Sequence, residues 1–598
     1  MINKKIQEIT ERIVERSKDS RASYLAMIRT NFDAGVKRNK LSCGNLAHGF
    51  AGCDAADKSI ISEGVQPNLG IITAYNDMLS AHKPYENYPP ELRDYAKEFN
   101  ASIQVAGATP AMCDGVTQGQ AGMDLSLMSR DVIALSTAIG LSHDMFDGVV
   151  NLGICDKIVP GLMIGNLNFG HLPAIFLPGG PMESGITNDE KARIRRDFAE
   201  GKIGRAELLK GESDSYHSPG TCTFYGTANS NQMLMEIMGL QLPGSSFVNP
   251  NTDMRKALNR EGIRTILKNI RSNDPAFSIG EIVNEKTMVN GIIGLLATGG
   301  STNLTIHLIA IAKAAGIKIT WDDFSDLSEI IPLIARVYPN GPADINHFHA
   351  AGGMAFLITT LLENNLLHED VTTILGKGMR AYTNEPKLMN GEITYVEGPK
   401  TAGNDTILRS VNEPFNSTGG LKVLKGNIGT SIIKTSAVSS EFHIIEEEAI
   451  VFQDQEELMS EFKADRLNKN FIAVLPFQGP RQKGMPELHN LTPSLTILQK
   501  RGFKVALVTD GRMSGASGKV PAAIHVSPEA ALGGAIGKIK TGDRIRLDAV
   551  NGKLICLSND LNDRPNRAVD YDDQSHGRTL FSNLRNLISD SEAGAGFI

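Results

Sequence analysis

The sequence predicts an α/β protein with a large N-terminal α/β domain on a mainly parallel sheet and a smaller C-terminal β-barrel-like (swivelling β/β/α) domain. Its 598 residues exceed the usual length of one domain. Through the first two thirds, short apolar runs bounded by glycine alternate with helical patterns, which is typical of a parallel sheet. A stretch rich in Gly, Asn, Pro and Thr at residues 392–427 interrupts this alternation of strand and helix patterns. We therefore expect domains over residues 1–400 and 401–598.

The N-terminal domain is predicted to begin with a helical extension over residues 1–65, because Ile2, Ile6, Ile9 and Ile13 recur at helical spacing. Strands are then expected at residues 70–75, 102–106 and 148–152. Helices are expected at residues 127–139, 227–238 and 304–315, each ending before a glycine that would act as a C-cap. In the C-terminal domain we expect strands at residues 430–434, 471–475 and 543–547.

Composition and charge exclude several classes of function. Sixty basic against 67 acidic residues give a net charge of −7, so the chain as a whole does not attract nucleic acid or an anionic membrane. Six scattered cysteines do not form a secreted disulfide framework, and Glu8, Glu11 and Glu15 argue against a targeting peptide. The two longest uncharged stretches are broken by Gly and Pro or by a Gly-Gly turn. We expect a cytoplasmic protein without membrane spans.

One local pattern carries most of the chemical information, namely the run from Ile154 to Gly161, which reads ICDKIVPG. It follows an apolar run and precedes a helix with Pro160 in its first turn. Cys155 would therefore lie at the carboxyl end of a strand, where ligands gather in α/β sheets. A helix N-terminus lowers the pKa of a thiol, so we expect a thiolate suited to metal binding. A buried, inert cysteine is the competing interpretation.

Two further cysteines lie in glycine-containing loops, Cys222 within residues 218–230 and Cys113 within residues 111–116. The spacing of the three cysteines matches no zinc finger or ferredoxin run, so only the fold could bring them together. Asp114 and Asp156, which adjoin two of the thiols, offer carboxylates of the kind that Mg²⁺ prefers. An ordinary surface position is the alternative for both.

Loops of the C-terminal domain and one loop of the N-terminal domain are candidates for anion binding. Residues 479–487 follow a predicted strand, and residues 510–518 (DGRMSGASG) resemble a backbone nest without matching a P-loop. Residues 298–303 lead into a helix, so their amides could hold a phosphate or cap the helix. Residues 37–40 and Arg130 are basic candidates for a phosphate site, and a solvated surface is the alternative for residues 37–40.

Taken together, these segments resemble the dihydroxy-acid and phosphogluconate dehydratase family. The family's Cys-Asp-Lys-x-x-Pro-Gly turn is present at residues 155–161, and its Asp-Gly-Arg-x-Ser-Gly loop at residues 510–515. The likeness runs from about residue 65 to the C-terminus. The segments 43–51, 74–82 and 220–226 place it nearest to the phosphogluconate branch.

The resemblance implies an iron–sulfur hydro-lyase that dehydrates 6-phospho-D-gluconate to 2-dehydro-3-deoxy-6-phospho-D-gluconate, a step of the Entner–Doudoroff pathway. Matched by position, the cofactor ligands would be Cys155, Cys222 and, as third ligand, Cys113. Mg²⁺ (or Mn²⁺) would be bound by Asp114, Asp156, Glu487 and Lys157. Lys157, carbamylated in some members, and Ser514, the proposed base, would be catalytic. Members with a 2Fe-2S cluster carry another cysteine where this chain reads Tyr75-Asn76-Asp77, so the resemblance implies a 4Fe-4S cluster.

Two alternatives to this function stay open. The substrate could be a branched dihydroxy acid or an unphosphorylated aldonic acid, because the shared motifs do not distinguish them. A protein of another class, an iron–sulfur electron carrier or sensor, would normally need four cysteine ligands, and Cys43 is the residue that could complete that set. We expect a small phosphorylated sugar acid as ligand, no nucleic-acid partner and a homodimer.

Overall fold

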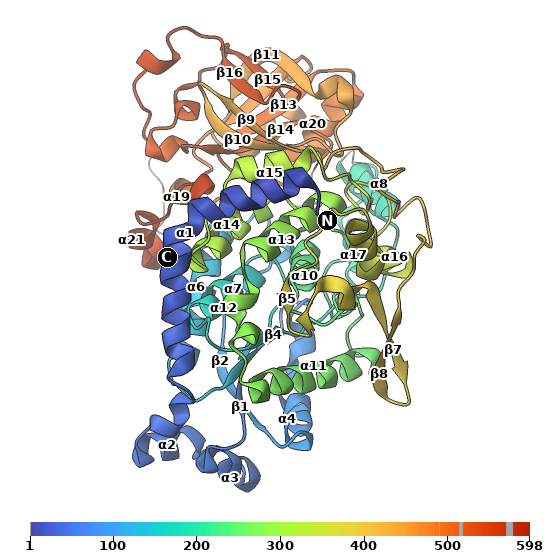
Figure 1. Cartoon of the computed structure of the whole chain (residues 1–598). Coiled ribbons are helices and arrows are strands. Elements are labelled where there is room, and N and C mark those ends of the chain that lie inside the picture. Colours follow the sequence, from blue (N-terminus) through green and yellow to red (C-terminus); the bar gives the residue numbers. More distant parts are fainter. Residues whose placement is uncertain (1, 200, 490, 514–517, 570–577) are drawn as a thin grey trace.

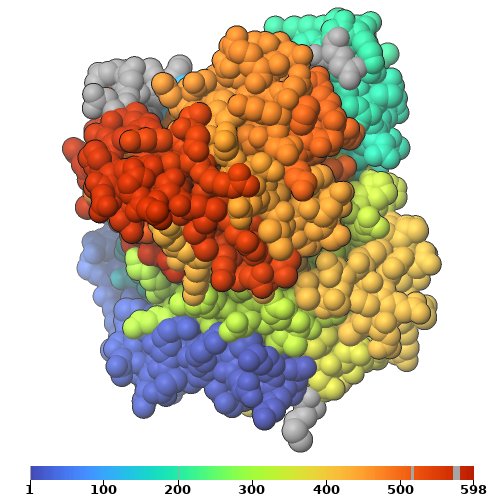
Figure 2. All heavy atoms as spheres, turned by 90° about the horizontal axis from the view of Figure 1, so that it is seen from above, coloured from blue at the N-terminus to red at the C-terminus, as the bar shows by residue number. Residues whose placement is uncertain are grey.

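The computed structural model describes residues 2–199, 201–489, 491–513, 518–569 and 578–598. It has a helix-rich body around a parallel sheet and a β-rich part at one end of that body (Figure 1). Viewed from above, the orange and red residues of the β-rich part cover much of the body (Figure 2). The expected combination of a parallel sheet and a barrel is confirmed, whereas the division at residue 400 stays a prediction.

The parallel sheet has the strand order β2-β1-β3-β4. Its strands are β1 (Asn68–Thr73), β2 (Ser102–Ala108), β3 (Gly148–Leu152) and β4 (Ala174–Phe176). All residues of β1, β3 and β4 are buried, as expected for strands covered on both faces by helices. Because all strands are parallel, the segments that follow β1, β2 and β3 emerge at the same edge of the sheet.

Helices cover this sheet. The sheet helices are α4 (Tyr88–Glu98), α6 (Ser126–Leu141), α7 (Ile158–Leu167) and α11 (Asp253–Ser272). The prediction that a helix ends before Gly140 is wrong, because α6 continues through that residue. A Cβ on Gly140 would lie 3.1 Å from the carbonyl oxygen of Ala106, so glycine there permits close helix–strand packing. The glycines after the other two predicted helices, Gly239 and Gly316, do have positive φ.

The first helix, α1 (Lys4–Asp33), is part of the main core. Ile6, Ile9 and Ile13 are buried, and the helix packs on α12 (Ile279–Ile282), α13 (Glu285–Thr298) and α15 (Trp321–Ser328). Two short helices follow, α2 (Cys43–Phe50) and α3 (Ala55–Glu63), at the end of the body remote from the β-rich part (Figure 1). The remaining body helices include α10 (Thr227–Ile237), α14 (Leu304–Ala314), α16 (Ile345–Ala350) and α17 (Gly353–Glu363), and the hairpins β5 (Thr372–Thr373) to β6 (Gly376–Lys377) and β7 (Asn384–Met389) to β8 (Glu392–Glu397) follow them.

The β-rich part is a closed barrel with the strand order β10-β14-β13-β12-β11-β15-β16-β9. Its strands are β9 (Leu421–Gly426), β10 (Gly429–Lys434), β11 (Ile444–Val451), β12 (Phe471–Leu475), β13 (Val505–Thr509), β14 (Ala522–Ser527), β15 (Arg544–Asp548) and β16 (Lys553–Cys556). Strands β11 to β14 pair in parallel, and α18 (Gln455–Lys463) and α20 (Leu491–Lys500) connect them. The predicted strand at residues 471–475 is confirmed to the residue. Among the helices that the structure describes, none is long and apolar enough to cross a membrane.

Candidate active site between sheet and barrel

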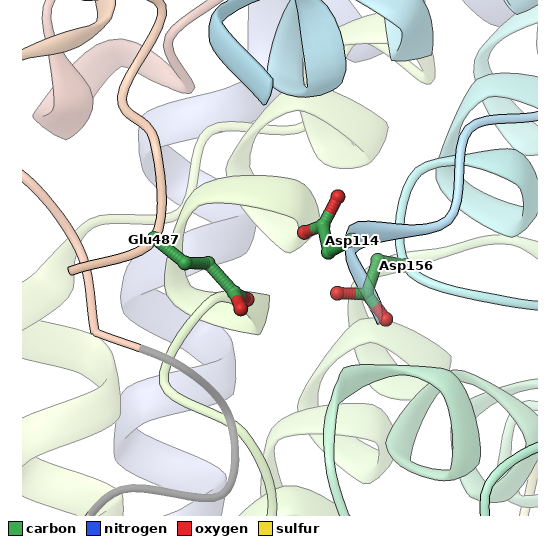
Figure 3. A group of neighbouring side chains, drawn as sticks. All are labelled: Asp114, Asp156 and Glu487. Carbon is green, nitrogen blue, oxygen red and sulfur yellow. The ribbon is translucent and has the colours of Figure 1, made fainter. Parts of the chain in front are cut away.

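Three carboxylates converge where the sheet edge meets the barrel (Figure 3). Asp114 begins α5 (Asp114–Thr117) after β2, and Asp156 follows β3. Glu487 lies between α19 (Pro480–Lys483) and α20, in the barrel part of the chain. One oxygen from each carboxylate lies within 4.8 Å of the others. The structure thus brings together the three acidic residues that the family resemblance implied as metal ligands.

Two buried cations accompany the carboxylates. The Lys157 ammonium lies 2.5 Å from Asp114 and 3.5 Å from Asp156. The Arg512 guanidinium donates through Nη2 to Asp114 at 2.9 Å and through Nη1 to Glu487 at 2.7 Å. Ser126 Oγ also donates to Asp114. With all three carboxylates ionised, these five side chains would carry one net negative charge.

Burial and these cations set the protonation of the acids. Burial alone would raise the pKa of Asp114, but Lys157 and Arg512 outweigh it and hold that pKa below its usual range. For Asp156, burial dominates and raises the pKa despite Lys157. Burial likewise raises the pKa of Glu487 to about 7, against the pull of Arg512. A divalent cation would stabilise these carboxylates as anions, and three hard oxygen donors fit Mg²⁺ or Mn²⁺.

Two other buried carboxylates hold the loop that carries Glu487. Asp510 accepts hydrogen bonds from the amides of Phe477, Gln478 and Ala530 at 2.8–3.0 Å. Glu529 accepts from the amides of residues 481 and 482, both at 3.0 Å. The amides at the start of the 479–487 loop are therefore occupied by the protein's own carboxylates. The Asp of the Asp-Gly-Arg motif thus holds the backbone immediately before this loop.

Three thiols converge beside the carboxylates. Cys113 immediately precedes Asp114, and Cys155 immediately precedes Asp156. Cys222 follows Thr221, which bridges to Pro181 beyond β4. Burial, then Cys113, Asp156 and Cys222, raise the pKa of Cys155 well above its ordinary value. Burial and Cys113 raise the pKa of Cys222 to about 12. Each thiol therefore lies within electrostatic reach of the others.

The expectation that a helix N-terminus lowers the pKa of Cys155 is wrong for the protein without a bound cofactor. Cys155 is 8% exposed, and desolvation together with neighbouring thiols and acids disfavours its thiolate. A metal cluster reverses this balance, because coordination stabilises the thiolate directly. Three soft sulfur donors within electrostatic reach of one another fit an iron–sulfur cluster better than a hard cation.

The other cysteines lie elsewhere. Cys43 is exposed on α2, at the remote end of the body (Figure 1). Cys53 accepts a hydrogen bond from Gln104 at 3.3 Å, and Cys556 is buried in the barrel core. A fourth thiolate for a fully ligated cluster is therefore not supplied by Cys43 in this conformation.

The sequence analysis did not identify some residues of the site, and one predicted residue lies outside the part of the chain that the structure describes. Arg512 lies within the 510–515 motif, but nothing in the sequence assigned it to the carboxylates. Ser126 and Gln118, whose amide lies 3.4 Å from Glu487, had no local signal. Ser514, the predicted base, lies outside the described residues, as does part of the predicted 510–518 nest.

The structure shows internal partners for several of the sequence-based candidates for phosphate binding. Arg130 is buried and donates to Asp131 and to the carbonyls of residues 594 and 595. Within residues 37–40, Arg38 is buried against Asp147 at 2.6 Å. The amides of Gly299, Gly300 and Ser301 all donate to groups of the protein. Each of these groups is occupied by an internal partner.

The three carboxylates form a group that could hold a metal ion, and comparison with known proteins identifies the class of protein. The N-terminal family model of the dihydroxy-acid/6-phosphogluconate dehydratases matches residues 66–382, and the C-terminal family model matches residues 406–595. The chain belongs to this dehydratase family, so the predicted resemblance and the predicted hydro-lyase class are confirmed.

Curated relatives extend over the whole chain. It is 56% identical to "Phosphogluconate dehydratase" of Rhizobium meliloti (strain 1021), and 54% identical to the protein of that name in Escherichia coli (strain K12). Both matches cover 99% of this chain and 99% of the relative. "Dihydroxy-acid dehydratase" of Sulfurisphaera tokodaii is 33% identical over 82% of this chain and 85% of its own length.

Proposed function

We propose that the protein dehydrates 6-phospho-D-gluconate to 2-dehydro-3-deoxy-6-phospho-D-gluconate, the dehydration step of the Entner–Doudoroff pathway. The observation that carries this proposal is the 51–56% identity, over 97% or more of both chains, to proteins named phosphogluconate dehydratase. The dihydroxy-acid dehydratase, at 33% identity, is a more distant relative. The carboxylate and thiol groups support the same chemistry.

The site would hold two cofactors. Cys113, Cys155 and Cys222 would bind a 4Fe-4S cluster, and Asp114, Asp156 and Glu487 would bind Mg²⁺ or Mn²⁺. When bound, these groups supply Lewis acidity toward the leaving hydroxyl and the substrate carboxylate. Support for this assignment comes from the donor chemistry, with soft sulfur on one side and hard oxygen on the other.

The protein's own side chains would remove the proton and orient the substrate. Loss of water removes the proton from C2 and the hydroxyl from C3, and the resulting enol becomes the 2-keto acid without net oxidation or reduction. Ser514 is our proposed base for the C2 proton. Arg512 would hold Glu487 and Asp114 in place while charge develops on the substrate.

Lys157 needs a change of charge to be a metal ligand. As an ammonium it binds Asp114 and Asp156 and would repel a cation. Addition of CO₂ to the neutral Nζ amine, with loss of a proton, would carbamylate Lys157 and make it an anionic oxygen donor at the same place. We therefore propose that Lys157 is carbamylated in the metal-loaded enzyme, which mass spectrometry of the intact protein would detect.

The assembly and location of the enzyme stay predictions. We propose a homodimer in the cytoplasm, and a barrel domain of the swivelling β/β/α type that closes over the sheet edge through Glu487. Support for the last point is that Arg512 and Glu487 both reach Asp114 from the barrel side.

The experiment that tests the function follows 2-keto acid formation by protein purified without oxygen. 6-Phosphogluconate, D-gluconate and 2,3-dihydroxyisovalerate are compared before and after exposure to air. Turnover of the phosphorylated acid, lost in air, is the expected result. Preference for another acid would overturn the substrate, and a loaded cluster without turnover on any acid would favour an electron carrier or sensor.

A further inference from the structure

A helical hairpin adjoins the thiol side of the site. It consists of α8 (Asn188–Ala199) and α9 (Arg205–Ser215). Its two ends are held together because the amide of Met182 donates to the carbonyl of Thr221 at 3.0 Å, and the amide of Thr221 donates to the carbonyl of Gly180 at 3.0 Å. Cys222 comes next in the chain. The segment 182–221, which contains the hairpin, therefore begins and ends next to Cys222, one of the predicted cluster ligands.

The hairpin carries a compact group of charged side chains. Arg195 forms a two-point ion pair with Glu212, with donor–acceptor distances of 2.5 and 2.9 Å. The Lys191 ammonium lies 4.0 Å from Glu212 and 3.6 Å from the centre of the Tyr216 ring. The Lys191 side chain is 14% exposed and that of Arg195 is 44% exposed. Two cations thus share one carboxylate and remain accessible to solvent.

This group has surplus positive charge. Burial, together with Arg195, lowers the pKa of Lys191 to about 8, although Glu212 and Cys222 act in the opposite direction. Arg195 uses two of its five N–H donors in the ion pair with Glu212 and also interacts with the Tyr216 hydroxyl, so further donors remain for a second anion. An incoming anion would relieve the repulsion between the two cations.

The cationic group also lies within electrostatic reach of both halves of the site. Lys191 acts electrostatically on Cys222, and Arg195 acts on His489, which is two residues beyond Glu487. Figure 1 shows α8 next to the barrel part, and Figure 2 shows the turquoise residues of the hairpin against its orange surface. The hairpin therefore borders both the thiols and the loop that carries the third carboxylate.

We propose that Lys191 and Arg195 bind the 6-phosphate of the substrate. This inference rests on the proposed function and names the residues that would select a phosphorylated acid. An arginine with free donors and a lysine ammonium suit a phosphate dianion, which prefers several charge-assisted hydrogen bonds. The substrate carboxylate would lie at the metal side, and its phosphate would extend past the thiols to the hairpin.

Steady-state kinetics on Lys191→Gln and Arg195→Gln would test this proposal, with Arg196→Gln as the matched control. Arg196 is exposed on the same helix. We expect KM for 6-phosphogluconate to rise about tenfold or more in each test variant, since a hydrogen bond to a charged group contributes on that scale. The inhibition constant of inorganic phosphate should rise likewise. Arg196→Gln should change neither constant more than about twofold.

The outcomes separate this inference from the proposed function. If the wild type fails to dehydrate 6-phosphogluconate, the proposed function is wrong. If it does so and the test variants keep the wild-type KM and phosphate inhibition, the assignment of Lys191 and Arg195 is wrong. A partly misfolded variant lowers kcat without changing KM, so KM stays informative. Turnover of D-gluconate, where measurable, should be unchanged in both test variants.

Discussion

Nη2 of Arg512 lies 2.9 Å from Oδ2 of Asp114, although 398 positions separate the two residues in the chain. Asp114 belongs to the edge of the parallel sheet, whereas Arg512 follows β13 of the barrel. The same guanidinium donates to Glu487 at 2.7 Å and to the carbonyl of Met485 at 2.7 Å. Arg512 therefore connects the two parts of the molecule at the place where their acidic residues meet.

Replacing Arg512 by methionine should destabilise the metal-free protein. The change leaves Asp114 and Glu487 buried without their shared cation, a loss of about 3–5 kcal/mol for a buried pair. Urea unfolding monitored by circular dichroism measures it. Arg501→Met, which removes a half-exposed arginine paired with Asp465, is the control and should cost less than about 1 kcal/mol. Equal effects in the two variants would show that Arg512 does not join the two parts.

Serine substitutions of the three converging cysteines should reduce bound iron. Cys155→Ser and Cys222→Ser are expected to lose most of the iron and the cluster's visible absorbance, because a hydroxyl is a poor ligand for a soft cluster iron. Cys113→Ser tests the third ligand in the same way. Cys53→Ser, which changes a half-buried thiol hydrogen-bonded to Gln104, should keep its iron. Retention of iron in Cys155→Ser would remove that residue from the cluster.

Substitution of Ser514 separates catalysis from cofactor binding. Ser514→Ala should abolish turnover and leave the absorbance of the cluster intact, because the hydroxyl is proposed to move a proton and not to bind iron. The measurement is kcat with 6-phosphogluconate, alongside the visible spectrum. If Ser514→Ala keeps most of the activity, another group must be the base.

The buried Glu236 should make stability depend on pH. Burial raises its pKa to about 7, although Ser246 and the amide of Gly244 donate to the carboxyl. The folded protein then binds a proton more tightly than the unfolded chain, in which this carboxyl has its ordinary pKa of 4.5. Its stabilising contribution is complete below about pH 4.5 and is lost as pH rises to about 7, by about 3 kcal/mol.

Glu236→Gln checks this pH dependence. The free energy of unfolding is measured at pH 5 and pH 8 for the wild type and the variant. The decrease between the two pH values should be smaller in the variant, because glutamine does not titrate. An identical decrease in both proteins would mean that Glu236 is ionised throughout.

Local patterns predicted much of the secondary structure but not the contacts of the site. The run at residues 471–475 is five apolar residues long and forms β12 as expected. The predicted helix end at Gly140 is wrong because this glycine permits close packing against Ala106 of β2. No local sequence pattern reveals a contact with another element. Likewise, the contact between Arg512 and Asp114 depends on how the barrel lies against the sheet. The family resemblance supplied Asp114, Asp156 and Glu487 as candidate metal ligands, whereas the internal hydrogen bonds of Arg130 could be seen only in the structure.

Anomalous X-ray scattering from crystals grown without oxygen in Mn²⁺ would test the two proposed metal sites most directly. Data collected at the manganese and iron absorption edges locate each metal independently. We predict manganese among Asp114, Asp156 and Glu487, and iron among Cys113, Cys155 and Cys222. Manganese bound away from the three carboxylates, or iron bound away from the three thiols, would contradict this assignment.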